Sequence, residues 1–291
     1  MKTTVENKEQ NKQTETAKPK RRRRLTLEEK FEKVKDLRPI DDVFFEVLAD
    51  DVEVCQEILS TILEDPNLVV KKVTVQNSKR NLYGRSVRLD ALCVLGNGSE
   101  VNIEVQRSDD DDHFRRIRLN GSVITAKDSQ SGMEFKEVPE LYIVYISEFD
   151  ILNEGRTTYH NDKVVRETGT IIEDGLHIVC VNTVNDDGSD TADLMSCFTK
   201  REVNNPKFPK FSGRVKMLKR TEGGVDSMCK VMSHYEEIAE ARGEARVEKK
   251  YISSLIEAAK GIISAFNVDK DMAVQIARVP EQYKTVVLAA L

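Results

Sequence analysis

The fold is decided by the stretch Arg88-Leu-Asp-Ala-Leu-Cys-Val-Leu95, Gly96-Asn-Gly-Ser99 and Glu100-Val-Asn-Ile-Glu-Val-Gln106. Apolar and β-branched residues alternate with polar ones on both sides of a Gly-Asn-Gly cluster, which is typical of a β-hairpin. Asp90 begins the first apolar run and Glu104 lies inside the second. Carboxylates beside a hydrophobic run usually have a partner, so these two residues call for an explanation.

One explanation is a divalent cation, because two convergent carboxylates and a nearby carbonyl supply the hard oxygen ligands that Mg²⁺ prefers. Glu104 and Gln106 are two residues apart on a strand, so their side chains leave the same face. The alternative is a plain antiparallel hairpin whose solvated face carries Asp90, Glu104 and Gln106. Spacing alone leaves both interpretations open.

The order of Asp90, about a dozen residues and then Glu104-Val-Gln106 resembles the PD-(D/E)XK nuclease core in its E-x-Q variant, the form of the recombination-promoting nuclease/putative transposase family. Further blocks resemble that family in the same order over roughly residues 36 to 235. These blocks are Arg38-Pro-Ile-Asp-Asp-Val-Phe-Phe45, Leu141-Tyr-Ile-Val-Tyr-Ile-Ser-Glu148, Thr158-Tyr-His160, Glu167-Thr-Gly169, Asp174-Gly-Leu-His-Ile178 and Glu222-Gly-Gly-Val-Asp-Ser-Met-Cys229.

The resemblance implies a restriction-endonuclease-like α/β fold, in which helices flank a mixed β-sheet. It implies a Mg²⁺ site, at which Mn²⁺ is expected to substitute, formed by Asp90, Glu104 and the Val105 carbonyl. Gln106 stands where the broader superfamily has a lysine that orients or activates the nucleophile. Asp41 corresponds to the acidic residue that the family carries on its first core helix. Capping of that helix by Asp41 and Asp42 is the competing interpretation.

A helix is predicted over residues 114–124, after the acidic run at 109–112, which we expect to be a solvated loop. In the resembling family this helix bears arginines beside the active site, which implies that Arg115, Arg116 and Arg118 contact nucleic acid. A solvent-facing basic stripe is the alternative. Relatives usually have a tyrosine after this arginine pattern, where this chain has Leu119-Asn120.

Composition indicates a soluble chain of one large domain with or without an appendage. Residues 1–24 hold nine Lys/Arg and three Glu, a net charge of +6, which leaves −11 on the remainder because the whole chain carries −5. We expect this tail to be disordered, since it has almost no apolar residue. It is either a nucleic-acid arm or a solvated tail. An acidic body counts against non-specific DNA binding, which depends on phosphate charge.

The five cysteines are scattered and lack metal-ligand spacing, so we expect reduced, buried thiols. No apolar run reaches about 18 residues and the N-terminus lacks a secretory signal, so we expect no membrane span and a cytoplasmic protein.

The predicted organisation is a basic tail over 1–24, a nuclease-like domain over 25–224 and a helical C-terminal extension over 225–291. Strands are predicted over 68–75, 141–146 and three short segments between 164 and 182, and helices over 26–34, 40–48 and 52–63. Gly223-Gly224 is expected to break the chain before a long helix that reaches about Phe266, with two short helices divided at Pro280. The extension either mediates homo-oligomerisation or packs on its own core.

The resulting hypothesis is a metal-dependent endodeoxyribonuclease that hydrolyses DNA phosphodiesters and, as the family name implies, promotes recombination. The first alternative is a catalytically inert descendant that binds DNA or a partner protein. The second is a defence or toxin-like nuclease that a partner protein controls.

Overall fold

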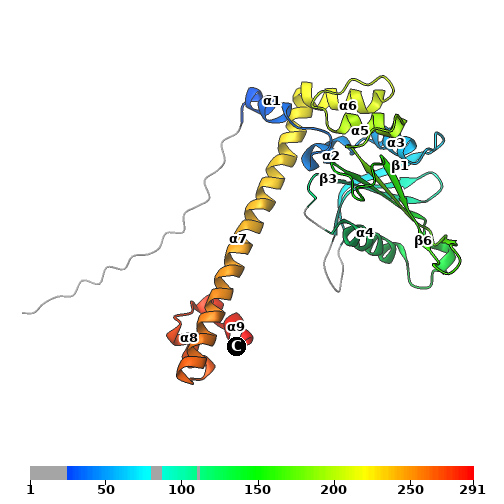
Figure 1. Cartoon of the computed structure of the whole chain (residues 1–291). Helices are drawn as coiled ribbons and strands as arrows, with labels where there is room; N and C mark the ends of the chain where they lie inside the picture. The colour runs from blue at the N-terminus through cyan, green and yellow to red at the C-terminus, as the bar shows by residue number, and fades with distance from the viewer. Residues whose placement is uncertain (1–24, 80–86, 110–111) are drawn as a thin grey trace, which may run out of the picture.

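The computed structural model describes residues 25–79, 87–109 and 112–291. The predicted basic tail therefore lies outside the described residues, as do two positions of the predicted acidic loop. The described part consists of a mixed β-sheet with helices on both faces and a long helix that leads to a second, smaller group of helices (Figure 1).

The helices are α1 (Leu27–Lys35), α2 (Asp42–Leu48), α3 (Val52–Ile62), α4 (His113–Asp128), the 3-10 helix η1 (Phe135–Glu137), α5 (Asp190–Phe198), α6 (Pro209–Arg220), α7 (Glu222–Phe266), α8 (Lys270–Ile276) and α9 (Glu281–Ala290). The strands are β1 (Val70–Lys79), β2 (Val87–Leu95), β3 (Glu100–Gln106), β4 (Leu141–Ser147), β5 (Thr158–Asn161), β6 (Lys163–Val164), β7 (Ile171–Ile172) and β8 (Leu176–Asn182).

Six of these strands form one sheet in the order β1-β2-β3-β4-β8-β5. β1, β2 and β3 are antiparallel, β3, β4 and β8 are parallel, and β5 is antiparallel to β8. α4 connects the parallel strands β3 and β4, because parallel neighbours cannot be joined by a tight turn. The structure thereby confirms the predicted hairpin, the buried central strand and the restriction-endonuclease-like α/β class.

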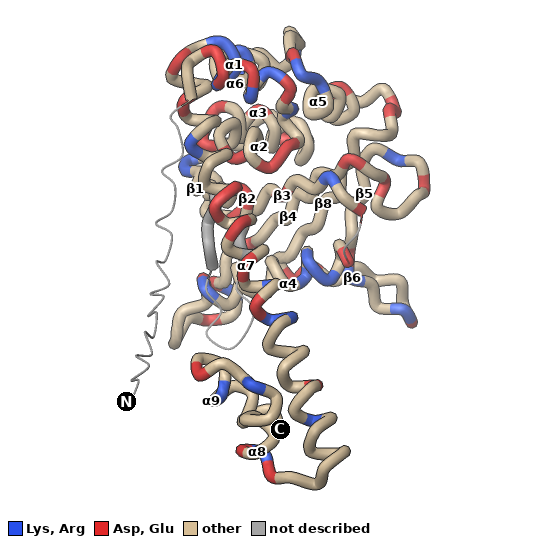
Figure 2. Tube along the Cα trace, turned by 90° about the vertical axis from the view of Figure 1, so that its left-hand side faces the viewer, with Lys and Arg blue, Asp and Glu red and all other residues tan. Residues whose placement is uncertain are grey.

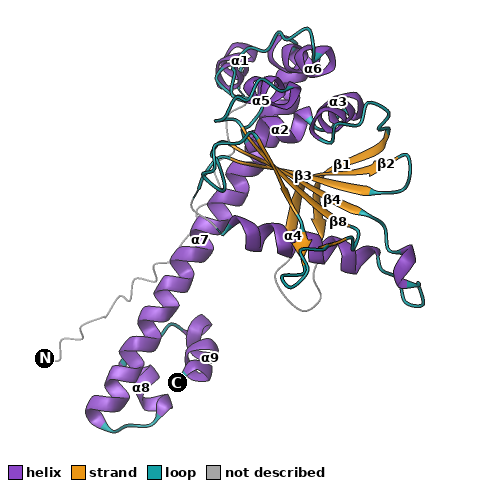
Figure 3. Cartoon of the chain, turned by 45° about the vertical axis from the view of Figure 1, so that its right-hand side comes forward, coloured by secondary structure: helices purple, strands orange, loops and turns teal. Residues whose placement is uncertain are grey.

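The sheet has one hydrophobic core on each face. Alternate residues of β3, Val101, Ile103 and Val105, pack in the core that α2, α3, α5, α6 and the start of α7 share, which we call the main core. The opposite face packs against α4 through residues such as Ile143 and Tyr145. Figure 3 shows α4 on one side of the sheet and most other helices on the other. Asn102 and Glu104 pair in register with Ile143 and Tyr145, and therefore lie on the α4 face.

Local signals determine several of these elements. Thr26 and Glu29 form the predicted capping box at the start of α1, each side chain bonding the other residue's backbone amide. The predicted break at Pro280 separates α8 from α9. All five cysteines are free and buried, as expected. Within the described ranges, no helix combines the length and apolar character needed to cross a bilayer.

Several features differ from the sequence predictions or were not predicted, among them the 3-10 helix η1. The short strand β5 lacks a strong local signal and forms by antiparallel pairing with β8. The helices α5 and α6 also lack such a signal and form through packing on the main core. Gly223 and Gly224 do not break the chain before the long helix. α7 begins at Glu222 and includes both glycines, because Thr221 caps it by accepting a hydrogen bond from the Gly224 amide.

The C-terminal helices have a core of their own. Ala259 of α7 packs with Ala273, Val274, Val279 and Val287 of the segment that follows, and partly buried residues of α7 surround them. The opposite end of α7 contributes to the main core instead. One continuous helix therefore joins two hydrophobic clusters.

Candidate active site

The two carboxylates of the hairpin lie where the β2–β3 ladder ends. The last paired residues are Ala91 and Ile103, and Asp90 is the next residue along β2. Its Oδ2 atom accepts a hydrogen bond from the Val105 amide nitrogen at 3.0 Å. The amide and carbonyl of one strand residue point towards the same neighbour, so the Val105 carbonyl is directed to the Asp90 side.

Glu104 is a buried carboxylate with an unsatisfied oxygen. Its side chain is 1 % exposed, and Oε1 accepts a hydrogen bond from Asn102 Nδ2 at 2.9 Å. Oε2 is buried without a hydrogen-bond partner among the described residues. Burial, helped by the negative charge of Asp90, raises the pKa of Glu104 to about 8. A buried acceptor without a partner is costly unless something else binds it.

Gln106 links β3 to α4 through its amide group. Its Nε2 donates to the Ser108 carbonyl at 2.8 Å, and its Oε1 accepts from Arg116 at 2.8 Å. The amide is therefore oriented at both ends, and the Arg116 guanidinium is held beside it. The positive charge of Arg116 also favours ionisation of Glu104. Of the three arginines predicted on α4, Arg116 is the one that contacts Gln106 and whose charge reaches Glu104.

The other two α4 arginines lie at the surface. Arg115 forms an ion pair with Asp112 at 3.2 Å, and Arg118 is exposed. The Asp112 side chain also caps α4, accepting from the Arg115 amide. The structure thus separates the predicted arginines into one that contacts Gln106 and two that face solvent.

Asp41 belongs to a network of two arginines and two acids. Arg107 lies 2.9 Å from its carboxylate, and the Arg38 backbone amide donates to it at 2.6 Å. Glu148, at the end of β4, accepts hydrogen bonds from Arg38 and Arg107. Although burial opposes it, these hydrogen bonds hold the pKa of the Glu148 carboxyl below its usual value. Asp41 occupies the N-cap position of α2, but its side chain makes no capping hydrogen bond.

The neighbouring Asp42 is also influenced by arginines of the candidate site. Burial raises the pKa of Asp42, and the positive charges of Arg116 and Arg107 oppose that rise. The charge of Arg116 therefore acts on both Asp42 and Glu104, while its guanidinium bonds Gln106. Sequence reasoning preferred Asp41 over Asp42, and it assigned no role to Arg107 or Glu148. The Glu148 contacts join residues more than 100 positions apart, which no local signal reveals.

The residues present fit a divalent cation in their chemistry. Asp90 and Glu104 supply carboxylate oxygens and Val105 a carbonyl, which are the ligands that Mg²⁺ prefers. The unpartnered Glu104 Oε2 is the atom that such an ion would satisfy. Within the described part of the chain, no group of three or more His, Cys, Asp or Glu side chains forms a metal cluster. A cation bound here would have two acidic side chains as ligands and would need backbone oxygen and water for the rest.

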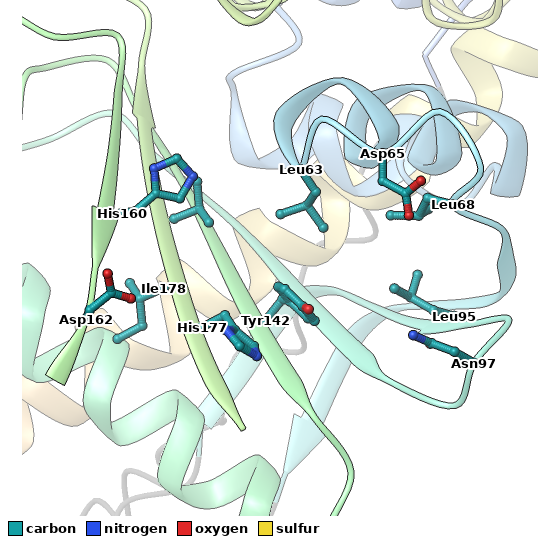
Figure 4. A pocket seen from close by; sticks show the side chains of 11 residues that line it. Leu63, Asp65, Leu68, Leu95, Asn97, Tyr142, His160, Asp162, His177 and Ile178 are labelled. Atoms are coloured by element: carbon teal, nitrogen blue, oxygen red, sulfur yellow. The ribbon is translucent and has the colours of Figure 1, made fainter. Parts of the chain in front are cut away.

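A separate hollow lies at the other end of the strands (Figure 4). It has a volume of about 370 Å³ and is lined by residues such as Leu95, Asn97, Tyr142 and His160. His177 stacks on Tyr142 there, with ring centres 4.4 Å apart, and lies 2.6 Å from Glu140. Asn97 is in the β2–β3 turn and Tyr142 is near the start of β4, whereas Gln106 ends β3. This hollow is therefore distinct from the carboxylate cluster.

Comparison with known proteins agrees with this geometry. The family model described as PD-(D/E)XK nuclease family transposase matches residues 41–189, just over half of the 291-residue chain. The matched range contains the hairpin, α4 and the parallel strands. Neither the curated proteins nor the solved structures contain a match. The chain belongs to the PD-(D/E)XK nuclease family transposases.

Proposed function

We propose that this protein is a Mg²⁺-dependent endonuclease that hydrolyses DNA phosphodiester bonds and acts in recombination. The observation that carries the proposal is the buried Glu104 carboxylate, which has one unsatisfied oxygen and whose pKa the nearby negative charge of Asp90 raises further. Such a costly arrangement is expected where a ligand compensates for it. The family assignment supports a nuclease-like function.

In this proposal, Asp90, Glu104 and the Val105 carbonyl hold the cation, and Asp41 joins through water. The bound cation supplies positive charge to the scissile phosphate and lowers the pKa of a water molecule. Gln106 orients the attacking water through its amide. A neutral amide carries no charge, so Arg116, held by Gln106, provides the cationic group beside the phosphate. Arg115 and Arg118 contact the DNA backbone further along α4.

The test is cleavage of supercoiled plasmid by the purified full chain with Mg²⁺ or Mn²⁺, with EDTA as the metal-free control. We expect nicked and linear products that disappear in Asp90→Ala and Glu104→Gln. Glu173→Gln, which changes an exposed acid, is the matched control and should cleave like the wild type. No nicking in the wild type, or unchanged nicking in Asp90→Ala, contradicts the proposal. A parallel assay on single-stranded RNA measures the preference for DNA.

A catalytically inert, DNA- or partner-binding descendant is the second candidate. The acidic body and the absence of a three-acid cluster from the described residues favour it. Calorimetric titration with Mn²⁺ separates the two candidates, because an inert protein predicts no binding that depends on Asp90. Mn²⁺ binding that is lost in Asp90→Ala supports the nuclease.

A further inference from the structure

The hollow at the far end of the sheet lies on the face that carries the main core. Tyr142, His177 and His160 line it from three neighbouring strands, β4, β8 and β5. Tyr142 pairs in register with His177, and His160 pairs with Val179, so the three rings leave this one face. Leu63, which also lines the hollow, is the first residue after α3. The hollow therefore lies where the helical cover of the sheet ends.

Two of these rings stack on each other. The ring centres of Tyr142 and His177 are 4.4 Å apart, and their planes differ by 21°. His177 Nε2 also lies 2.6 Å from a carboxylate oxygen of Glu140, which fixes the edge of the imidazole ring. Aromatic faces carry negative partial charge and attract cations, and flat groups pack well on them. The stacked pair is therefore a fixed surface for a cationic or planar group.

Several polar groups of the hollow have no protein partner. The Tyr142 hydroxyl, the His160 imidazole and the Asp162 carboxylate make no hydrogen bond or ion pair with any described residue. Asp65 accepts the Asn67 backbone amide with Oδ1 at 2.9 Å, and its Oδ2 makes no hydrogen bond within the described ranges. These groups are free to accept hydrogen bonds from a ligand.

The hollow also has a negative charge that no basic residue balances. Asp65 and Asp162 line it, Glu140 lies beside it, and no Lys or Arg is among the described residues that line it. Burial raises the pKa of Tyr142, and the charges of Glu140 and Asp65 raise it further, which places both acids near the hydroxyl. Elsewhere acidic and basic positions are interspersed along the chain (Figure 2). With its histidines neutral, the hollow attracts cations and repels phosphates.

The two acids lie at opposite ends of the hollow. Figure 4 shows Asp65 in the loop after α3 and Asp162 after β5, with Tyr142 between them. Apolar side chains such as Leu95 and Val179 also line the hollow. A ligand that reaches both acids must be elongated, carry two separated positive charges and cover apolar surface between them. A peptide segment with two basic residues has these properties, because the aliphatic stems of long basic side chains pack on apolar groups.

We propose that this hollow binds a basic peptide segment of a partner protein, with one arginine near Asp65 and Tyr142 and a second near Asp162 and His160. Arginine suits the hollow better than lysine, because its planar guanidinium packs on aromatic rings and donates five hydrogen bonds. The carboxylates, the Tyr142 hydroxyl and the unprotonated nitrogen of His160 are the acceptors. The hollow is separate from the carboxylate cluster, so this proposal does not depend on nuclease activity.

NMR titration of the histidine ring protons of the full chain tests the binding. The probes are Gly/Ser peptides with two arginines separated by one to five residues, which covers roughly 7–20 Å at ~3.3–3.6 Å per extended residue. At least one peptide should shift the His160 and His177 signals with a Kd below about 1 mM. His113 and His234 lie outside the hollow, and their signals should not move. Binding should weaken as salt rises.

Matched peptides and variants test the role of charge. Citrulline in place of both arginines keeps the shape and removes the charge, and should abolish the shifts. Asp65→Asn and Asp162→Asn should each raise Kd about two- to fivefold, the range for exposed ion pairs, and the two losses should multiply in the double variant. Glu257→Gln makes a matched charge change at an exposed position of α7 and should bind like the wild type. Circular dichroism checks that each variant is folded.

The proposal is overturned if no two-arginine peptide moves the His160 and His177 signals. Equal binding of the citrulline peptide, or unchanged binding in Asp65→Asn/Asp162→Asn, also overturns it. If arginine methyl ester binds as tightly as the best peptide, the ligand is a small organic cation instead. If single-stranded oligothymidylate moves the same two signals, the hollow binds nucleic acid instead.

Discussion

At the scale of single residues, the candidate site combines a buried acid with groups that orient its neighbours. Glu104 is enclosed by protein, Asp90 accepts a hydrogen bond from the Val105 backbone amide, and Gln106 is held between Ser108 and Arg116. The cost of ionising Glu104 is electrostatic, because the ionised carboxylate would be held out of water with one oxygen unpaired. That cost should be measurable without any substrate.

The pKa of Glu104 predicts how the stability of the metal-free protein depends on pH. Its folded-state value of about 8 exceeds that of an unfolded glutamate. The folded state therefore retains a proton that the unfolded state loses, and stability falls as pH rises from about 4.5 through about 8. Each pKa unit corresponds to about 1.4 kcal/mol, so the loss is on the order of a few kcal/mol.

The comparison that isolates this effect is the wild type against Glu104→Gln, in EDTA. Thermal unfolding should give similar midpoints near pH 5 and a more stable variant near pH 8.5. Equal midpoints for the two proteins at both pH values would show that Glu104 does not carry the proton.

Arg116 and Arg118 form a second residue-scale comparison. Arg116 donates a charge-assisted hydrogen bond to Gln106, whereas Arg118 is exposed on the same helix. A hydrogen bond to a charged group contributes ~1.5–3 kcal/mol. If the proposed nuclease activity holds, its loss in Arg116→Ala should lower the cleavage rate about 10- to 100-fold. Arg118→Ala should change DNA affinity and its salt dependence with little effect on the rate at saturating DNA. Single-turnover kinetics distinguish the two, and equal losses in both variants would contradict the positioning of Gln106 by Arg116.

At the scale of secondary-structure elements, two adjacent glycines have different surroundings. A Cβ on Gly224 would lie 2.5 Å from the Met217 carbonyl oxygen and 2.6 Å from Leu218 Cα, so α6 and the start of α7 touch there without a side chain between them. A Cβ on Gly223 would meet no atom within 4 Å. The two adjacent glycines therefore do not break the helix. One of them, Gly224, allows the close contact between α6 and α7.

This contrast predicts opposite results for two alanine substitutions. Gly224→Ala forces α6 and α7 apart and should cost about 1–3 kcal/mol of unfolding free energy. Gly223→Ala should be neutral or stabilising by up to about 1 kcal/mol, because alanine is the better helix former. Urea denaturation measures both. A Gly224→Ala protein as stable as Gly223→Ala would contradict the close contact.

At the scale of the whole molecule, α7 belongs to both hydrophobic clusters. Val225, Met228 and Cys229 pack in the main core, and Ala259 packs with the C-terminal helices. We propose the organisation of a nuclease-like domain over 25–224 followed by a helical extension over 225–291. The core contacts mean that the first part of α7 is needed for the stability of that domain.

Two truncations test this division. A chain that ends at residue 240 keeps the α7 residues that pack in the main core, and its nuclease-like domain should unfold near the wild-type temperature. A chain that ends at residue 224 loses Val225, Met228 and Cys229 and should be several kcal/mol less stable, at ~1.5–3 kcal/mol for each buried apolar side chain. Differential scanning calorimetry compares them. Equal stability of the two truncations would show that α7 adds nothing to the main core.

Sequence alone determined the elements whose signals are local. The Gly-Asn-Gly turn and the flanking apolar alternation specify the hairpin, and the capping box at Thr26 specifies the start of α1. The sequence also places Asp90, Glu104 and Gln106 on that hairpin. It predicts that Glu104 and Gln106 share one face of their strand, because alternate side chains of a strand point to the same face.

Only the tertiary structure decided which groups meet across the chain. Arg38 and Glu148 are 110 residues apart, and the crossover through α4 brings Arg116 to Gln106. The need for glycine at position 224 likewise comes from its contact with α6, a helix that no strong local sequence signal predicts. Local patterns report the conformation of a few neighbouring residues. Contacts between distant segments depend on how whole elements pack, and no short stretch of sequence contains that information.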